Sequence, residues 1–204
     1  MENINFTGHF LIAMPALNDP FFAKSVTFIC AHNQDGAMGV VINRPTDFLL
    51  KNLFVQMNIS IEDTDNNIIS QSIHLGGPVQ PERGFVLHQI SENNESLISS
   101  CNAEWNSTII INNNTALTTS KDILEAVANG TGPDKVLLAL GYAGWNPGQL
   151  EAEIAKNDWL SVKTEDISAQ SALLYDLPSA EKMNAALSLL GLDFSKLSEE
   201  VGHA

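Results

Sequence analysis

Short apolar runs separated by turn-forming residues open the chain. The runs Phe10–Met14 and Val26–Ala31 are rich in strand-forming residues, and Asn18-Asp-Pro20 between them favours a turn. Asp35-Gly36 is a hairpin signal, and the apolar run Val40–Ile42 follows it closely. We therefore expect three early strands, of which the second and third pair antiparallel across the hairpin.

The apolar pattern changes to a helical period after Arg44 and again near the C-terminus. Thr46 is placed to cap the first of these helices, and Gly191 to end the last. The positions that follow the 3.6-residue period are Leu49, Leu50, Leu53, Phe54 and Met57 in the first, and Met183, Ala186, Leu187 and Leu190 in the last.

Further strands and helices alternate in the second half of the chain. Phe85–His88 and Thr108–Ile111 predict strands, and a helix opens at Thr119 or Ser120 and ends at Gly130. The polar stretch 91–106 between the two strands is predicted to be an exposed connection.

Val136–Leu140 is apolar on both faces, which is typical of a central strand covered on both sides. Asn146 as N-cap and Pro147 at the first helical position predict a helix, and Trp159–Val162 predicts the strand after it. Strand, glycine turn, helix and strand together resemble a βαβ unit.

We therefore predict an α+β or mixed α/β fold, in which a mixed, partly curved β-sheet is flanked by helices and one βαβ-like unit lies in the C-terminal half. With 204 residues, 44% of them hydrophobic, the chain suits a single domain spanning residues 1–204. That domain has room for two closely packed subdomains dividing near residues 100–115.

The charge balance argues against nucleic acid as a partner. Ten Lys and Arg residues stand against 24 Asp and Glu residues, a formal net charge of -14 that repels phosphate backbones and anionic lipids. The N-terminus lacks a secretory signal, and no apolar run approaches the roughly 20 residues of a membrane-spanning helix. We expect a cytoplasmic protein, not associated with membranes, with Cys30 and Cys101 as free thiols.

The segment Gly141-Tyr-Ala-Gly-Trp-Asn-Pro-Gly-Gln-Leu150 is the first candidate ligand site. In an open α/β sheet, ligands commonly bind where a buried strand leads into a helix. Trp145 could stack on a ring and Gln149 could hydrogen-bond it, although the glycines fit no nucleotide-binding motif. A tight turn with Trp145 in the core is the alternative.

The pair Gly76-Gly77 is the second candidate, because adjacent glycines can present backbone amides as an anion-binding nest. Arg83 and His88 follow it, and Asn43-Arg44 at a strand end supplies the only other arginine. If the two arginines converge, a carboxylate or phosphate ligand fits. A rigid turn is the alternative.

None of the five histidines has a recognised metal-ligand spacing, and no motif indicates a metal or other cofactor. An enzyme that uses His88 or His32 as acid or base beside the amide nest is a hypothesis based on residue types alone. The catalytic residues of such an enzyme are not indicated by any nucleophile motif.

Ordered motifs along nearly the whole chain resemble those of the bacterial YqgE/AlgH family. They are Gly8-His-Phe-Leu-Ile-Ala-Met-Pro15, Gly36-Ala-Met-Gly-Val-Val-Ile-Asn-Arg-Pro45, Gly76-Gly-Pro-Val79, Arg83-Gly-Phe-Val-Leu-His88, Leu140-Gly-Tyr-Ala-Gly-Trp145, Asn157-Asp-Trp-Leu160 and Gly202-His-Ala204. One departure is Met183, where the family is expected to have tryptophan.

The resemblance implies a bacterial cytosolic protein with a compact mixed α/β fold and no established biochemical activity. One branch of the family is associated with alginate production, from which a transcriptional role was inferred. Our leading hypothesis is a binding or regulatory module that recognises a small anionic ligand or a protein partner. The alternatives are the histidine enzyme and a transcriptional role that the charge of the chain makes indirect.

Overall fold

The computed structural model describes residues 4–61, 67–90 and 105–192. The elements of the N-terminal half are β1 (Phe10–Ala13), β2 (Val26–Asn33), β3 (Gly36–Val41), β4 (Pro45–Leu49), α1 (Leu50–Gln56), the 3-10 helix η1 (Asn67–Ser70), β5 (Ser72–Leu75) and β6 (Val79–Gln89). Those of the C-terminal half are β7 (Thr108–Asn112), β8 (Thr115–Thr118), α3 (Lys121–Ala128), β9 (Val136–Trp145), α4 (Gln149–Ala155), β10 (Trp159–Val162), α5 (Ile167–Ser171), the π-helix η3 (Ala172–Asp176) and α6 (Ser179–Ser188).

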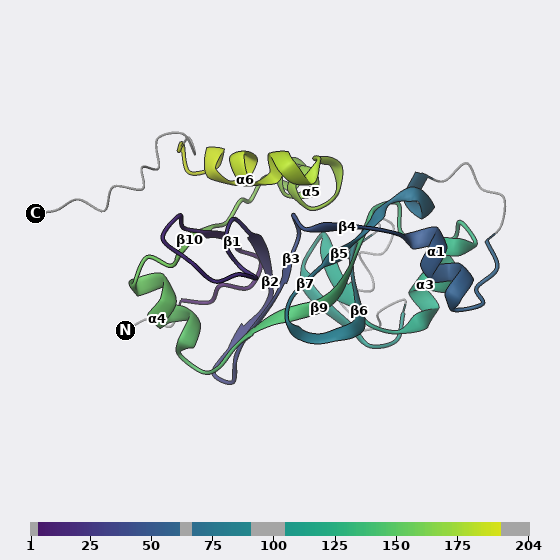
Figure 1. Cartoon of the computed structure of the whole chain (residues 1–204), viewed down its shortest axis with the longest axis horizontal. Helices are drawn as coiled ribbons and strands as arrows, with labels where there is room; N and C mark the ends of the chain where they lie inside the picture. The colour runs from purple at the N-terminus through teal and green to yellow at the C-terminus, as the bar shows by residue number, and fades with distance from the viewer. Residues whose placement is uncertain (1–3, 62–66, 91–104, 193–204) are drawn as a thin grey trace, which may run out of the picture.

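The strands form one mixed sheet in the order β10-β1-β2-β3-β9-β6-β8-β7. Neighbours along this path are antiparallel, whereas β5 pairs with β9 in parallel and with β4 in antiparallel orientation. The sheet curves so that β7 at one end lies against β2 (Figure 1). The predicted fold class, a mixed and partly curved sheet flanked by helices, is confirmed.

The βαβ-like unit consists of β9, α4 and β10. These two strands run in the same direction, because four successive antiparallel pairings separate them through β3, β2 and β1. The crossover therefore spans most of one half of the sheet and places α4 at its outer end (Figure 1).

Helices cover both faces of the sheet and enclose three hydrophobic clusters. The residues of β9 alternate between two of these clusters: Leu137 and Ala139 face the cluster under α6, while Val136 and Leu138 face the one under α1 and α3. The prediction of a central strand covered on both sides is confirmed. Met183, at the position that departs from the family pattern, is buried against the first cluster.

Three local predictions were wrong. Thr46 lies in β4, where its hydroxyl donates to the Ile73 carbonyl over 2.7 Å, and α1 begins only at Leu50. β9 continues through the expected turn to Trp145, and α4 has Gly148 as its N-cap instead of Asn146. The strand β8 was not predicted. For Thr46 and for the expected turn in β9, strand pairing outweighs the local propensity.

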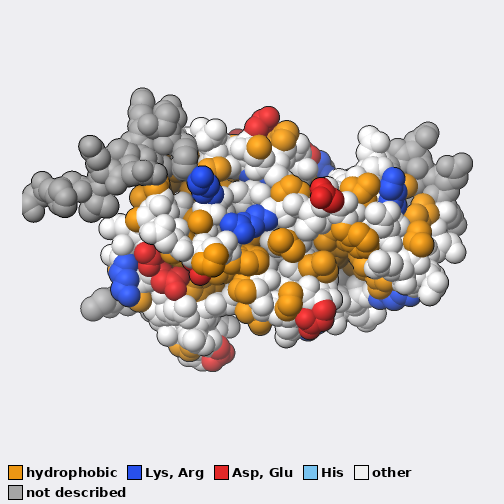
Figure 2. All heavy atoms as spheres, in the orientation of Figure 1, with side chains coloured by type: hydrophobic (Ala, Val, Ile, Leu, Met, Phe, Trp, Pro, Cys, Tyr) orange, Lys and Arg blue, Asp and Glu red, His pale blue; other side chains and the backbone are white. Residues whose placement is uncertain are grey.

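No helix among the described residues is long and apolar enough to span a membrane. On the face seen in Figure 2, Lys and Arg side chains form separate small patches among hydrophobic and acidic ones. Cys30 is a free, buried thiol. Cys101, the family motif Gly202-His-Ala204 and most of the predicted connection 91–106 lie outside the described residues.

Candidate functional site

A groove crosses the ends of β2, β3 and β9 on one face of the sheet. Ala31 pairs with Met38, and Met38 with Gly144, so these three residues form a row across the strands. Ala31 and Gly144 are small, and the row is therefore hollowed beside the larger Met38. The hollow has a volume of about 470 Å³.

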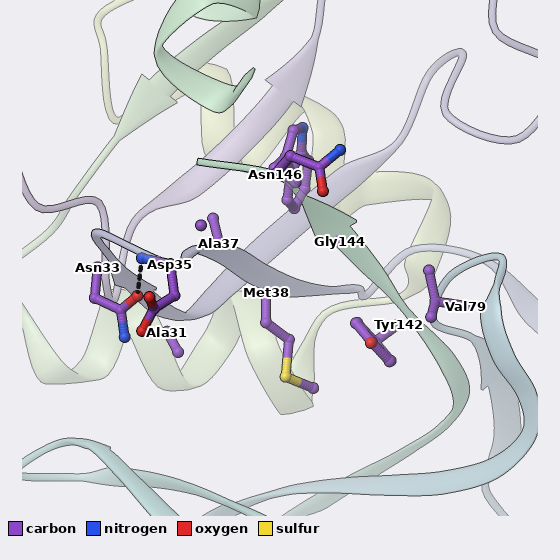
Figure 3. A pocket seen from close by; sticks show the side chains of 11 residues that line it. Ala31, Asn33, Asp35, Ala37, Met38, Val79, Tyr142, Gly144 and Asn146 are labelled. Carbon is purple, nitrogen blue, oxygen red and sulfur yellow. Dashed lines mark hydrogen bonds between the residues drawn. The ribbon is translucent and has the colours of Figure 1, made fainter. Parts of the chain in front are cut away.

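Apolar side chains form the middle of this groove. Met38 and Tyr142 project into it from the neighbouring strands β3 and β9, and Val79 at the start of β6 closes one end (Figure 3). Tyr142 rests edge-on against Phe85, with the ring centroids 5.3 Å apart. The hydroxyl of Tyr142 forms no hydrogen bond within the described part of the chain and is free for a ligand.

Polar groups at the other end come from the β2–β3 hairpin and from the start of the α4 connection. The Asp35 amide donates to Asn33 Oδ1 over 2.8 Å, which closes the turn, and Asn146 lies across the groove (Figure 3). The Asp35 carboxylate has no ion-pair partner among the described residues, and no Lys or Arg lines the groove. The local charge is therefore negative.

Trp145 and Gln149, from the first predicted site, serve the structure of α4. The Trp145 indole N–H donates to Glu153 Oε2 over 2.8 Å, and the Gln149 side-chain amide donates to Glu153 Oε1 over 2.9 Å. Trp159 donates its indole N–H to the same Oε2 over 2.9 Å. Trp145 borders the groove but is only 6% exposed.

The pair Gly76-Gly77 lies where the backbone of β9 passes very closely. The Gly76 amide donates to the Leu140 carbonyl over 2.8 Å, and the Gly76 carbonyl accepts from the Val41 amide over 2.9 Å. A Cβ on Gly77 would overlap the backbone of Tyr142. Close approach of two backbone segments is a physical reason for both glycines.

The two arginines have separate partners. Arg44 donates to the Ala23 carbonyl over 2.8 Å and lies over the Phe21 ring, while Asn43 bonds Val26 and Lys24 in the same loop region. Arg83 on β6 donates to Thr119 Oγ1 over 3.0 Å and to Gln80 Oε1 over 3.3 Å. Arg44 and Arg83 share no partner among the described residues, and ligand binding by either stays a prediction.

The candidate acid–base histidines are engaged in the fold. His88 is 2% exposed, its Nε2 lies 2.9 Å from Thr118 Oγ1, and burial lowers its pKa to about 4. His32 accepts from the Phe6 amide through Nδ1 and lies 3.1 Å from Glu151 through Nε2. Neither lines the groove. Within the described residues, no cluster of His, Cys, Asp and Glu is placed to hold a metal.

Sequence reasoning placed Trp145 beside the groove but missed Met38, Tyr142 and Asp35. The signal is the alternation Tyr142, Gly144, Asn146, which puts every second residue of an extended strand on one face. It was missed because Gly141-Tyr-Ala-Gly was interpreted as a turn.

The fold defines a mixed α/β protein built on a curved sheet, and comparison with known proteins gives its family. The model of a family described as AlgH-like matches residues 10–195. A UPF0301 protein from Nitrosospira multiformis is 49% identical over 204 residues, covering 100% of both chains. One from Chromobacterium violaceum is 46% identical over the same length, again with 100% of both covered. The chain belongs to the AlgH-like family, which confirms the resemblance found in the sequence.

Two solved structures are similar to this one. The solution structure of the AlgH protein from Pseudomonas aeruginosa matches with a TM-score of 0.72 and 40% identity, covering 100% of both chains. A crystal structure of a Corynebacterium diphtheriae protein matches with a TM-score of 0.66 over 90% of this chain and 88% of that one. At 18% identity, the second shares the fold alone. Family and fold together leave the reaction, if any, unassigned.

Proposed function

We propose that this chain is a bacterial cytosolic binding module that takes an extended, basic segment of a partner protein in the groove across β2, β3 and β9. The observation that carries the proposal is the unpaired Asp35 carboxylate at the end of an apolar hollow without basic residues. An unpaired carboxylate there attracts a Lys or Arg side chain and repels an anion.

The apolar part of the groove supports recognition of a side chain beside that charge. Tyr142 offers a flat ring with a free hydroxyl, and Met38 has an unbranched side chain that adapts to different shapes. The net charge of -14 favours the approach of a basic partner over longer distances.

This arrangement favours a protein partner over a small anionic ligand at the groove. It does not support the enzyme built on a histidine, because the groove contains neither His32 nor His88. An effect on transcription would then pass through the partner protein, in keeping with the indirect role expected from the charge.

The test uses fluorescence anisotropy with three matched sets of extended peptides, basic, neutral and acidic. We expect the basic set to bind, with affinity that falls as NaCl is raised. Asp35→Asn should weaken binding about two- to fivefold, as for an exposed ion pair. Gly144→Leu, which fills the hollow, should weaken it by at least about tenfold.

Two control variants make the same kinds of change outside the groove. Asp47→Asn neutralises an exposed carboxylate on β4, and Gly84→Val adds a side chain to β6 outside the groove. Both should leave peptide affinity within about twofold of the parent chain, because neither contacts the groove. Equal affinity for the acidic and basic peptide sets, or an unchanged peptide affinity in Gly144→Leu, would contradict the proposal.

A further inference from the structure

A second hollow, separate from the groove, lies between the sheet and the helices α1 and α3. Its volume is about 180 Å³. Six apolar side chains line it: Leu53, Met57, Val86, Leu124, Leu138 and Leu140. They come from α1 and its C-terminal residue, from α3 and from two neighbouring strands, so both helices and the sheet enclose the space.

The hollow exists because Gly84 has no side chain. Gly84 pairs with Leu140 and Val86 with Leu138, so these four residues share one face of β6 and β9. A Cβ on Gly84 would stand 3.5 Å from Leu138 Cδ1, with no other heavy atom beyond its chain neighbours within 4 Å. The backbone of Gly84 has no left-handed φ, and a larger residue is therefore compatible with its conformation.

The mouth is polar and has no unpaired cation among its described lining residues. Lys121 is paired with Glu125 over 2.8 Å, and Glu82 adds a carboxylate. Thr119 Oγ1 accepts from Arg83 Nη2 over 3.0 Å, while its own proton has no acceptor among the described residues. One hydroxyl donor is thus available beside an apolar space.

We propose that this cavity binds a compact, neutral, mostly apolar molecule of about benzene size that carries one hydrogen-bond acceptor. The volume decides the size, because apolar cavities of about 150 Å³ hold a single benzene molecule. The apolar lining favours a ligand with an apolar body, and the free Thr119 proton favours a hydrogen-bond acceptor on that ligand. The site is independent of the peptide groove and shares no lining residue with it.

Acetophenone is the probe, because it combines one ring with one carbonyl acceptor. Binding is followed by chemical-shift changes in two-dimensional amide spectra and by calorimetry. We expect saturable shifts at Gly84, Thr119 and Leu124, weaker binding of ethylbenzene, which lacks the acceptor, and weaker binding of benzoate, which is charged. Thr119→Val should lower acetophenone affinity about fivefold and leave ethylbenzene unchanged.

Gly84→Val fills the cavity and should abolish acetophenone binding, with Gly84→Ala as a graded variant that gives an intermediate loss. Gly144→Leu fills the groove instead and should leave acetophenone affinity within about twofold. Unchanged binding by Gly84→Ala and Gly84→Val, or no saturable binding by the parent chain at millimolar probe, overturns this proposal. Neither result bears on the proposed peptide groove, because that proposal is tested separately with Gly144→Leu and Asp35→Asn.

Discussion

Lys182 donates its ammonium to the carbonyl of Leu174 over 2.8 Å, although the lysine is only 2% exposed. Leu174 lies in the π-helix η3, whose last backbone hydrogen bond runs from the Leu177 amide to the Ala172 carbonyl and leaves the Leu174 carbonyl without a backbone donor. Lys182 on α6 thus supplies the donor that the backbone lacks. The junction between η3 and α6 therefore depends on a buried cation.

The free energy of unfolding should rise with pH because of Lys182. Burial lowers the pKa of this amine from 10.5 to about 8, and Asp176 opposes the shift. Between pH 8 and 10.5 the unfolded chain keeps a proton that the folded chain has released, which adds on the order of 3 kcal/mol to stability. The comparison is with Lys182→Met, by urea unfolding across that range.

Other groups titrate in the same pH range, but their contributions cancel when the parent chain is compared with Lys182→Met. Burial raises the pKa values of Cys30 and Tyr175, so both oppose the trend as the pH increases. Because they are present in both chains, the difference in unfolding free energy isolates Lys182. A difference that stays flat from pH 8 to 10.5 would contradict the lowered pKa of Lys182.

His88 should make the protein less stable in acid. Its pKa is lowered from 6.5 to about 4 by burial, partly offset by the Gln89 carbonyl. The neutral imidazole contributes to the free energy of unfolding of the protein above pH 6.5. This contribution, on the order of 3 kcal/mol, is lost as the pH falls to 4. His74 has a pKa lowered to about 4 by burial and shifts stability in the same direction.

His88→Gln keeps a polar partner for Thr118 and removes the titrating group. The stability advantage of the parent chain over this variant should shrink between pH 6.5 and 4. Imidazole resonances give an independent readout, and those of His88 should remain in the neutral form at pH 5. Titration of His88 near pH 6.5 in the folded protein would show this assignment to be mistaken.

The sequence patterns predicted most of the strands and the four helices α1, α3, α4 and α6, because those patterns follow largely from burial on one or both faces. They failed at Gly141, which has a φ of 71° and shifts the alternation of β9 by one residue. Leu137 and Ala139 face one cluster before it, and Tyr142 faces the same cluster after it. A strand that changes its phase at a glycine looks like a turn in the sequence.

The candidate sites were harder to predict than the strands. The groove depends on Ala31, Met38 and Gly144 lying in one row, and that row is set by a register shift between Ile29 and Ala31. Strand register is fixed by tertiary pairing and is not encoded locally. The cavity similarly depends on Gly84, whose absent side chain matters only beside Leu138.

Glu153 should be the most sensitive acidic residue of α4. Its Oε2 accepts both indole N–H groups, from Trp145 and Trp159, whose rings lie 6.0 Å apart. Glu153→Ala leaves two largely buried donors without an acceptor, at a cost of about 2–4 kcal/mol. Glu153→Gln keeps one carbonyl acceptor and should lose less. Glu181→Ala, on the exposed side of α6, should change stability by about 0.5 kcal/mol or less.

Urea unfolding followed by tryptophan fluorescence measures both the stability and the environment of these rings. The emission of folded Glu153→Ala should shift relative to that of the parent chain, because two indoles lose their acceptor. Equal stability of Glu153→Ala and Glu181→Ala would mean that the shared carboxylate is not needed to hold α4 on the sheet.

Gly77 and Gly84 offer a matched test of what glycine does in this fold. A Cβ on Gly77 would overlap the carbonyl of Tyr142, whereas a Cβ on Gly84 makes one ordinary contact, 3.5 Å from Leu138 Cδ1. Gly77→Ala should therefore destabilise the chain by at least about 3 kcal/mol, and Gly84→Ala by less than about 1 kcal/mol. Thermal and urea unfolding of the two variants gives the comparison directly. If Gly77→Ala folds with the stability of the parent chain, close backbone approach does not explain the pair Gly76-Gly77.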